Sequence, residues 1–187
     1  HCLDLRLQCE AHEAAVIAAA RRLHNFEGSS RLELNARHQD HEEAWLAYCG
    51  WLIQKQNISL VLCVFERAVA ACRGIGATMW HRYCNFVSQH LKDIQLTLRV
   101  SRRAIRNCPQ NVEFHLLHMR ALERDGAEAS VVDTARVRAL RSPLSGGADA
   151  RRAVLLSYCD FCRRRLQKSW SCLEPVAEDC INYIQLL

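Results

Sequence analysis

The sequence predicts an all-α fold, an α-solenoid of antiparallel helix hairpins. Apolar residues make up 50% of the 187, whereas Gly and Pro number only 7 and 3. An all-β sandwich or barrel needs a turn about every 8–12 residues, so this scarcity of helix breakers argues against one. The apolar content also excludes a disordered chain. A helical pattern that returns about every 35 residues predicts stacked repeats, each of which buries its apolar face against its neighbours.

The beginning of the chain predicts one helix and a connection. Residues 2–25 include an Ala-rich run and are expected to form a helix, the second half of a preceding repeat. Residues 26–39 are expected to be a linker. We therefore expect 1–30 to be a helix of a preceding repeat plus linker, and 31–187 to be the repeat array. Because the chain starts at His1 and not at Met, we expect it to be part of a longer protein.

The first helix of each repeat carries two large side chains at positions i and i+3. Such spacing places both on one helix face, and the copies follow one another after 34 to 41 residues. These predicted core residues are Trp45, Tyr48, Trp80, Tyr83, Phe114, Leu117, Leu155 and Tyr158.

The second helix of each repeat carries an Arg followed by a small Ala. The pairs are Arg67 and Ala68, Arg103 and Ala104, and Arg138 and Ala139. A small side chain at this position lets neighbouring helices approach closely. The fourth copy, around Asp179, is weaker. The four hairpins are predicted over 42–73, 78–108, 111–141 and 150–187.

Helix boundaries agree with this division. Asp93 is placed to cap the helix that follows it, and Ser130 with Asp133 resembles a capping box. Pro109 and Pro143 fall where helices are expected to end, because proline disfavours helix at the residue before it.

The repeat resembles the half-a-TPR (HAT) repeat. Its first helix has the Trp-x-x-Tyr pattern and its second helix the Glu-Arg-Ala-Val pattern of that family. The run Arg-Ala-Ile-Arg-Asn-Cys-Pro at 103–109 is also similar, as are 121–126 and 158–165. The resemblance covers about 31–187.

The resemblance implies a non-catalytic protein-binding scaffold of a nuclear RNA-processing factor. Within the family it points to pre-mRNA splicing, to recycling of the U4/U6 small nuclear ribonucleoprotein (snRNP) and to recruitment of ubiquitin-specific proteases. The implied partners are such proteases and snRNP components, with a possible homodimer through repeats beyond this chain. The alternatives within the family are ribosomal RNA processing, mRNA 3′-end formation and spliceosome assembly. The longest uncharged apolar stretch, 44–54, is too short to cross a bilayer, so no membrane partner is expected.

No motif predicts catalysis, a metal site or a cofactor. The sequence has no Gly-x-Ser-x-Gly elbow, phosphate-binding loop or paired carboxylates. Cys159 and Cys162 form a single Cys-x-x-Cys, but in the repeat they occupy core-side positions, where a free thiol acts as a small apolar group. The 11 cysteines are expected to be reduced, in an intracellular protein. A Cys/His metal-binding or redox domain is the alternative from another class.

Two basic clusters are candidate partner-binding sites. Arg99, Arg102 and Arg106 share a helix face with the motif residue Arg103. The second cluster consists of Arg163, Arg164, Arg165 and Lys168, followed by Trp170. The pattern fits two interpretations. One is a solvated helix face with late arginines that complement the helix dipole. The other is a site for an acidic protein or for an RNA backbone, where Arg offers bidentate contacts.

Overall fold

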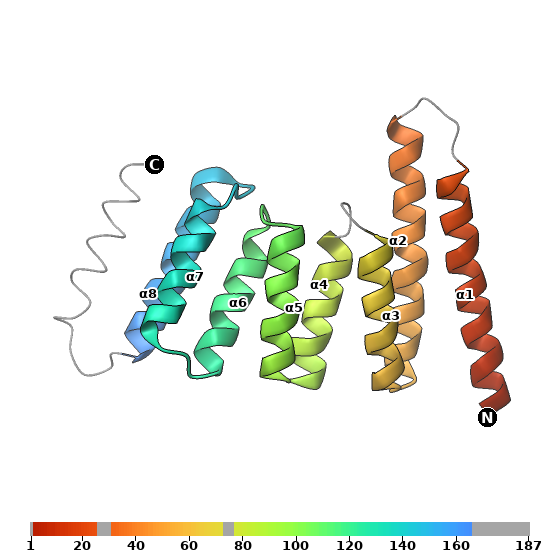
Figure 1. Cartoon of the computed structure of the whole chain (residues 1–187), viewed down its shortest axis with the longest axis horizontal. Coiled ribbons are helices and arrows are strands. Elements are labelled where there is room, and N and C mark those ends of the chain that lie inside the picture. The colour runs from red at the N-terminus through yellow and green to blue at the C-terminus, as the bar shows by residue number, and fades with distance from the viewer. Residues whose placement is uncertain (1, 26–30, 73–76, 166–187) are drawn as a thin grey trace. The chain divides into compact units, whose positions relative to one another are not determined.

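The structure is a computed structural model and describes residues 2–25, 31–72 and 77–165. Within these ranges the chain forms helices joined by short connections and contains no strand, which confirms the all-α, helical-repeat class (Figure 1). Not one of the helices in these ranges combines the length and the apolar character that a membrane span requires. The elements are α1 (Cys2–His24), α2 (Arg31–Gln54), α3 (Ile58–Ala71), α4 (Ala77–Asn85), the π-helix η1 (Phe86–Leu91), α5 (Ile94–Asn107), α6 (Val112–Arg124), α7 (Ala129–Arg141) and α8 (Gly147–Arg165).

The chain divides into two compact units, His1–Tyr83 and Cys84–Leu187. The first contains α1 to α3 and most of α4, and the second contains η1 and α5 to α8. The second helix predicted for the fourth hairpin, 166–187, lies outside the described residues.

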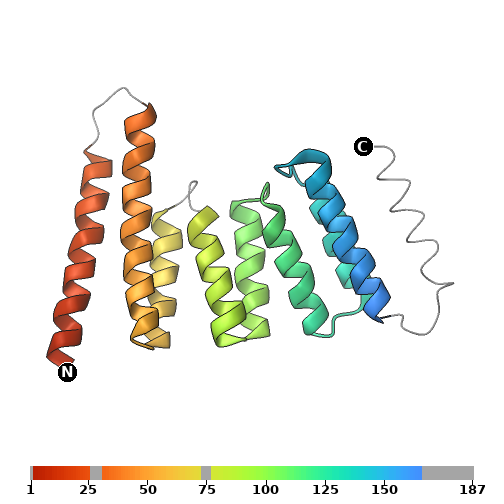
Figure 2. The same ribbon diagram turned by 180° about the vertical axis from the view of Figure 1, so that it is seen from behind.

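In the first unit, α1 and α2 run antiparallel over most of their length (Figures 1 and 2). The linker expected over 26–39 is therefore wrong in its second half, because α2 begins at Arg31. Leu34 and His38 of this first part of α2 border the same cavity as Leu23 of α1. Arg37 also donates to the carbonyl oxygen of Arg22 at 2.6 Å. These contacts with α1 explain the extra helical turns, which the weak apolar pattern of 31–41 does not predict.

The core of the first unit is aromatic. Trp45 and Tyr48 of α2 are buried, as are Phe65 of α3 and Trp80 and Tyr83 of α4. The Phe65 and Tyr83 rings stack with centroids 4.9 Å apart. Aromatic pairs in such arrangements add about 0.5–1.5 kcal/mol beyond the burial of their area.

The core of the second unit is mainly aliphatic and centres on α6, which contacts α5, α7 and α8. One cluster of its buried residues consists of Leu98, Met119, Ala121, Leu122, Val132, Ala139, Leu140, Val154, Leu155, Tyr158, Phe161 and Cys162. Leu117, predicted as core, is only half-buried, whereas its neighbour Met119 is buried. The i, i+3 rule did not anticipate this shift, because α6 is packed from several sides and buries more than one stripe.

Side chains cap three of the helices. Asn57, Asp93 and Asn111 accept from backbone N–H groups in the first turns of α3, α5 and α6, at 3.2, 2.8 and 3.0 Å. The cap predicted at Asp93 is thus confirmed. The capping box predicted at Ser130 and Asp133 is wrong, because α7 begins one residue before Ser130 and Asp133 instead pairs with Arg136 at 2.7 Å.

The alanine of the second helix is fully buried in all three described repeats. Ala68, Ala104 and Ala139 each have 0% of their surface exposed. The arginine before each alanine is not a core residue, since Arg67 and Arg138 are exposed and Arg103 is half-buried. The cost of burying a guanidinium charge explains this arrangement. The alanine fills the helix contact, and the arginine lies at its edge.

Candidate partner-binding pocket

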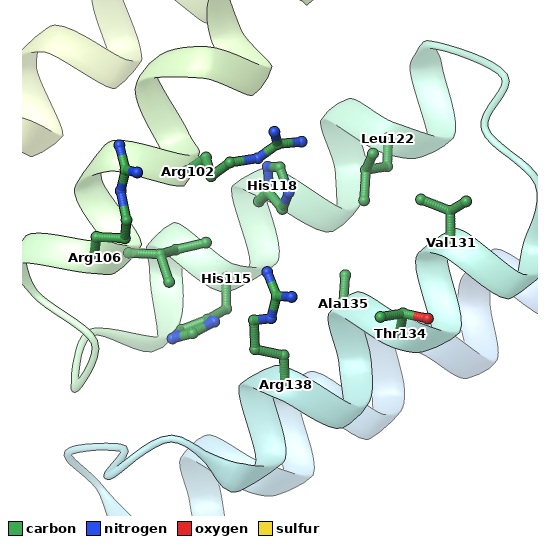
Figure 3. Close-up of a pocket in the computed structure, with 10 residues that line it drawn as sticks. Arg102, Arg106, His115, His118, Leu122, Val131, Thr134, Ala135 and Arg138 are labelled. Carbon is green, nitrogen blue, oxygen red and sulfur yellow. The ribbon is translucent and has the colours of Figure 1, made fainter.

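A pocket of about 550 Å³ lies between α5, α6 and α7 of the second unit (Figure 3). It contains two of the three α5 arginines that the sequence singled out, Arg102 and Arg106, and leaves out Arg99. We call it the arginine pocket. Its lining residues are Arg102, Ile105, Arg106, His115, His118, Leu122, Val131, Thr134, Ala135 and Arg138.

The arginines reach the pocket from two helices. Figure 3 shows the guanidinium groups of Arg102, from α5, and Arg138, from α7, turned toward the space around His118, whereas that of Arg106 points away along the rim. All three side chains are exposed. Among the described residues, no carboxylate forms a salt bridge with any of them. The pocket is therefore a place of concentrated positive charge.

Two histidines of α6 add polar groups without adding charge. Burial lowers the pKa of His118 to about 4, and the nearby charges of Arg102 and Arg138 act in the same direction. The Nδ1 atom of His118 is 2.9 Å from the Ser101 hydroxyl. Burial also lowers the pKa of His115, whose Nε2 donates to the Pro109 carbonyl oxygen at 2.9 Å. Both rings are thus neutral near pH 7 and held in place.

The lining also has an apolar side. Val131 is a large apolar residue with 44% of its surface exposed, and it borders the pocket together with Ala135 of α7 and Leu122 of α6. Figure 3 places these three residues on the side opposite Arg106. Among the residues that the structure describes, no Phe, Tyr or Trp lines the pocket.

The second predicted basic cluster is engaged within the unit. Arg164 of α8 forms a bidentate pair with Glu123 of α6, with N–O distances of 2.6 and 2.8 Å. Arg163 lies 3.4 Å from Asp160 on its own helix. Neither arginine lines the arginine pocket. Lys168 and Trp170 lie outside the described residues.

The arginine of the repeat motif has a different environment in the first unit. Arg67, the counterpart of Arg138, forms a bidentate pair with Glu13 of α1 at 2.5 and 2.7 Å. Its guanidinium also lies 5.3 Å from the centroid of the Trp45 ring. The hydrogen bond from Arg67 lowers the pKa of Glu13 and raises that of Arg67.

Helical spacing in the sequence indicates Arg102 and Arg106 but not the rest of the pocket. The repeat pattern places Arg138 only in the motif, and it places the histidines in no site. The sequence does contain one signal, because Val131, Thr134, Ala135 and Arg138 have i, i+3, i+4 and i+7 spacing and share a helix face. What brings that face opposite Arg102 is the stacking of α5, α6 and α7.

Eight cysteines of the described residues form no disulfide. Cys49, Cys84, Cys108 and Cys162 are buried. Burial raises the pKa of Cys49 and of Cys84 to about 12. Within the described ranges, no group of three or more His, Cys, Asp or Glu side chains is arranged to hold a metal ion.

Comparison with known proteins gives one consistent set of relatives. No family model matches the chain. It is 31% identical over 127 residues to the spliceosome associated factor 3, U4/U6 recycling protein, of Danio rerio. The matched part is 67% of this chain and 13% of that relative. The protein of the same name from Homo sapiens is 31% identical over 121 residues, and the one from Mus musculus is 29% identical over 121.

Each of these three matches covers about two thirds of the chain, or 64% to 67%. The chain spans only 12% or 13% of the length of these relatives, so the similarity is to one segment of each. The family resemblance drawn from the repeat residues agrees with this result. Over about two thirds of its length, the chain is a homologue of a segment of the spliceosome associated factor 3 proteins.

Proposed function

We propose that this chain is a non-catalytic, protein-binding scaffold segment of a nuclear splicing factor. The observation that carries the proposal is the 31% identity to proteins named U4/U6 recycling proteins, over 67% of the chain in the first of them. The helical-repeat fold supports it, because stacked hairpins present long surfaces to partners.

The arginine pocket supports binding in preference to catalysis. Its polar groups are three arginines, two neutral histidines and Thr134, whose hydroxyl donates to the Ser130 carbonyl oxygen at 2.8 Å. The lining residues include no carboxylate, and the Thr134 hydroxyl is bonded to a backbone carbonyl oxygen instead of to either histidine, so it lacks the contact with a base that activates a nucleophile. Arginines beside apolar side chains are typical of partner recognition.

The family resemblance supplies the finer part of the proposal. The partners would be snRNP components and a ubiquitin-specific protease, and the site of action would be the nucleus. A homodimer through repeats beyond this chain is a further expectation of the same resemblance, whereas contact with an RNA backbone is an expectation from the basic clusters.

The test is recovery of partners from nuclear extract with the chain as bait. We expect U4 and U6 RNAs and their proteins to be enriched, as measured by reverse-transcription PCR and mass spectrometry. A bait with Arg102, Arg106 and Arg138 all changed to Glu shows whether the arginine pocket takes part. Enrichment of pre-ribosomal or mRNA 3′-end factors instead would contradict the splicing assignment and point to another RNA-processing complex.

A further inference from the structure

We propose that the arginine pocket binds an acidic segment of a partner protein. One side-chain carboxylate of that segment would lie between Arg102 and Arg138, and a neighbouring apolar side chain would contact Leu122, Val131 and Ala135. The inference rests on the proposed role as a protein-binding scaffold, and it names the chemistry of the partner and the site that takes it.

The first argument comes from the chain itself. Arg67, at the same repeat position as Arg138, is bonded by both oxygens of the Glu13 carboxylate. In the first unit, α1 therefore supplies an acid to the motif arginine of α3. Around Arg138, no Asp or Glu is found among the lining residues that the structure describes. A partner carboxylate would complete in the second unit the pairing that Glu13 makes in the first.

The second argument is geometric. The Arg102 and Arg138 guanidinium groups approach the same space from helices α5 and α7 (Figure 3). Two guanidinium groups on opposite sides of one anion can both donate, and each can do so in bidentate fashion. The neutral His118 ring lies between them without filling the site with a further cation, and Ser101 holds its Nδ1 atom.

The third argument selects a protein over an RNA. Val131 exposes 44% of its surface beside Leu122 and Ala135, so one side of the pocket offers apolar contact that a phosphate backbone cannot use. Binding of single-stranded RNA typically relies on aromatic platforms for the bases, and no Phe, Tyr or Trp lines this pocket within the described residues. An acidic residue next to Leu, Ile or Val in the partner would match both the arginines and the apolar side of the pocket.

The experiment is a selection from a display library of random dodecapeptides on the purified chain. We expect the recovered peptides to be enriched in Asp or Glu next to Leu, Ile or Val. The consensus peptide is then synthesised with a fluorescent label, and its dissociation constant is measured by fluorescence anisotropy. Replacement of its acidic residues by Gln or Asn should weaken binding at least about tenfold, as loss of charge-assisted hydrogen bonds does.

Two double variants locate the site. Arg102→Glu with Arg138→Glu should weaken peptide binding by more than about tenfold, whereas Arg99→Glu with Arg120→Glu should change it less than about twofold. Both variants alter the net charge equally, and Arg99 and Arg120 are exposed residues outside the pocket. Thermal unfolding followed by circular dichroism shows that each variant is folded.

Several results would overturn the proposal. They are a selection without acidic enrichment, equal losses in the two double variants, and full binding by the pocket variant. A labelled single-stranded RNA that binds in the pocket, while no acidic peptide is selected, would assign the site to nucleic acid instead. The partner-recovery experiment tests the splicing role separately, since it can succeed or fail whatever the peptide selection gives.

Discussion

Arg67 and Arg138 occupy the same position of the repeat but meet different neighbours. Arg67 is paired with Glu13 and lies over the Trp45 ring. Arg138 lies in a pocket with Arg102 and Arg106 and forms no salt bridge with a carboxylate of the described residues. The alanines that follow them, Ala68 and Ala139, are buried to the same degree.

The comparison separates two roles within one motif. The alanine maintains the helix contact, and its environment is the same in both units. The arginine at the edge of that contact has an environment that depends on the neighbouring helix. Where that helix supplies an acid, the arginine contributes to internal structure, and where it does not, the arginine can be used by a partner.

The largest expected effect concerns the part that the units share. Ala104→Trp and Ala68→Trp should each lower the free energy of unfolding by about 1–3 kcal/mol, because both alanines are fully buried and a large side chain overpacks the contact. Urea denaturation followed by circular dichroism measures this. Ala70→Trp, at an exposed position of α3, is the control and should be nearly neutral. Unchanged stability in the two buried variants would show that the repeat register is wrong.

The next effect belongs to the second unit and depends on pH. The pKa of His118 is about 4 in the folded chain, against an ordinary value of 6.5, so the unfolded chain binds more protons between these values. Stability from this group is complete above pH 6.5 and is lost as the pH falls toward 4. From pH 7 to pH 5 we expect a loss of about 1–2 kcal/mol.

His118→Asn, which keeps a polar atom near Nδ1, should reduce this pH dependence when urea unfolding is repeated at each pH. His24→Asn, at an exposed position of α1, should leave it unchanged. If the two variants show the same pH dependence as the original chain, His118 is not the group responsible.

A smaller effect on the free energy of unfolding distinguishes Arg67 from Arg138. Arg67→Ala should cost about 1 kcal/mol, since it removes a partly exposed ion pair and a cation–π contact. Arg138→Ala should cost less than about 0.5 kcal/mol, as expected of a surface residue without a partner. Urea denaturation of both variants gives the comparison. Equal costs would remove the distinction drawn between the units.

The smallest expected effect on stability comes from a new carboxylate placed beside Arg138 in the second unit. Thr134→Glu places a carboxylate one helical turn before Arg138 on α7 and should raise stability by about 0.3–0.5 kcal/mol. It should also weaken binding of the acidic consensus peptide strongly, because the new carboxylate occupies Arg138 and repels the carboxylate of the peptide. Thr134→Gln, which adds similar bulk without charge, should retain peptide binding in the anisotropy assay. Strong peptide binding by the Glu variant would contradict the proposed site.

Much of the fold could be predicted because it depends on local spacing. The i, i+3 pattern identified Trp45, Trp80 and Phe114 as inward-facing, and Asp93 was recognised as a helix cap. The first turns of α2 and the π-helix η1 were missed. Neither has a strong local pattern, and the contacts of α2 with α1 are tertiary.

The pocket could be predicted only in part for the same reason. Helical spacing grouped Arg102 with Arg106, and also with Arg99, which proves to lie outside the pocket. Spacing along one helix cannot show which residues of α7 face α5 across α6. Arg138 therefore entered the site only through the helix packing of the second unit.

The rate at which the buried thiols are alkylated reports how fast the helices around them separate. With a pKa of about 12, only about one in 10⁵ of the Cys49 and Cys84 side chains is thiolate at pH 7, and both are covered by neighbours. An alkylating reagent must wait for the helices around each thiol to separate. The exposed Cys63 needs no such opening, and its labelling rate serves as the reference for an accessible thiol. Labelling kinetics at Cys49 would then time the opening of the first unit, without any mutation or attached dye.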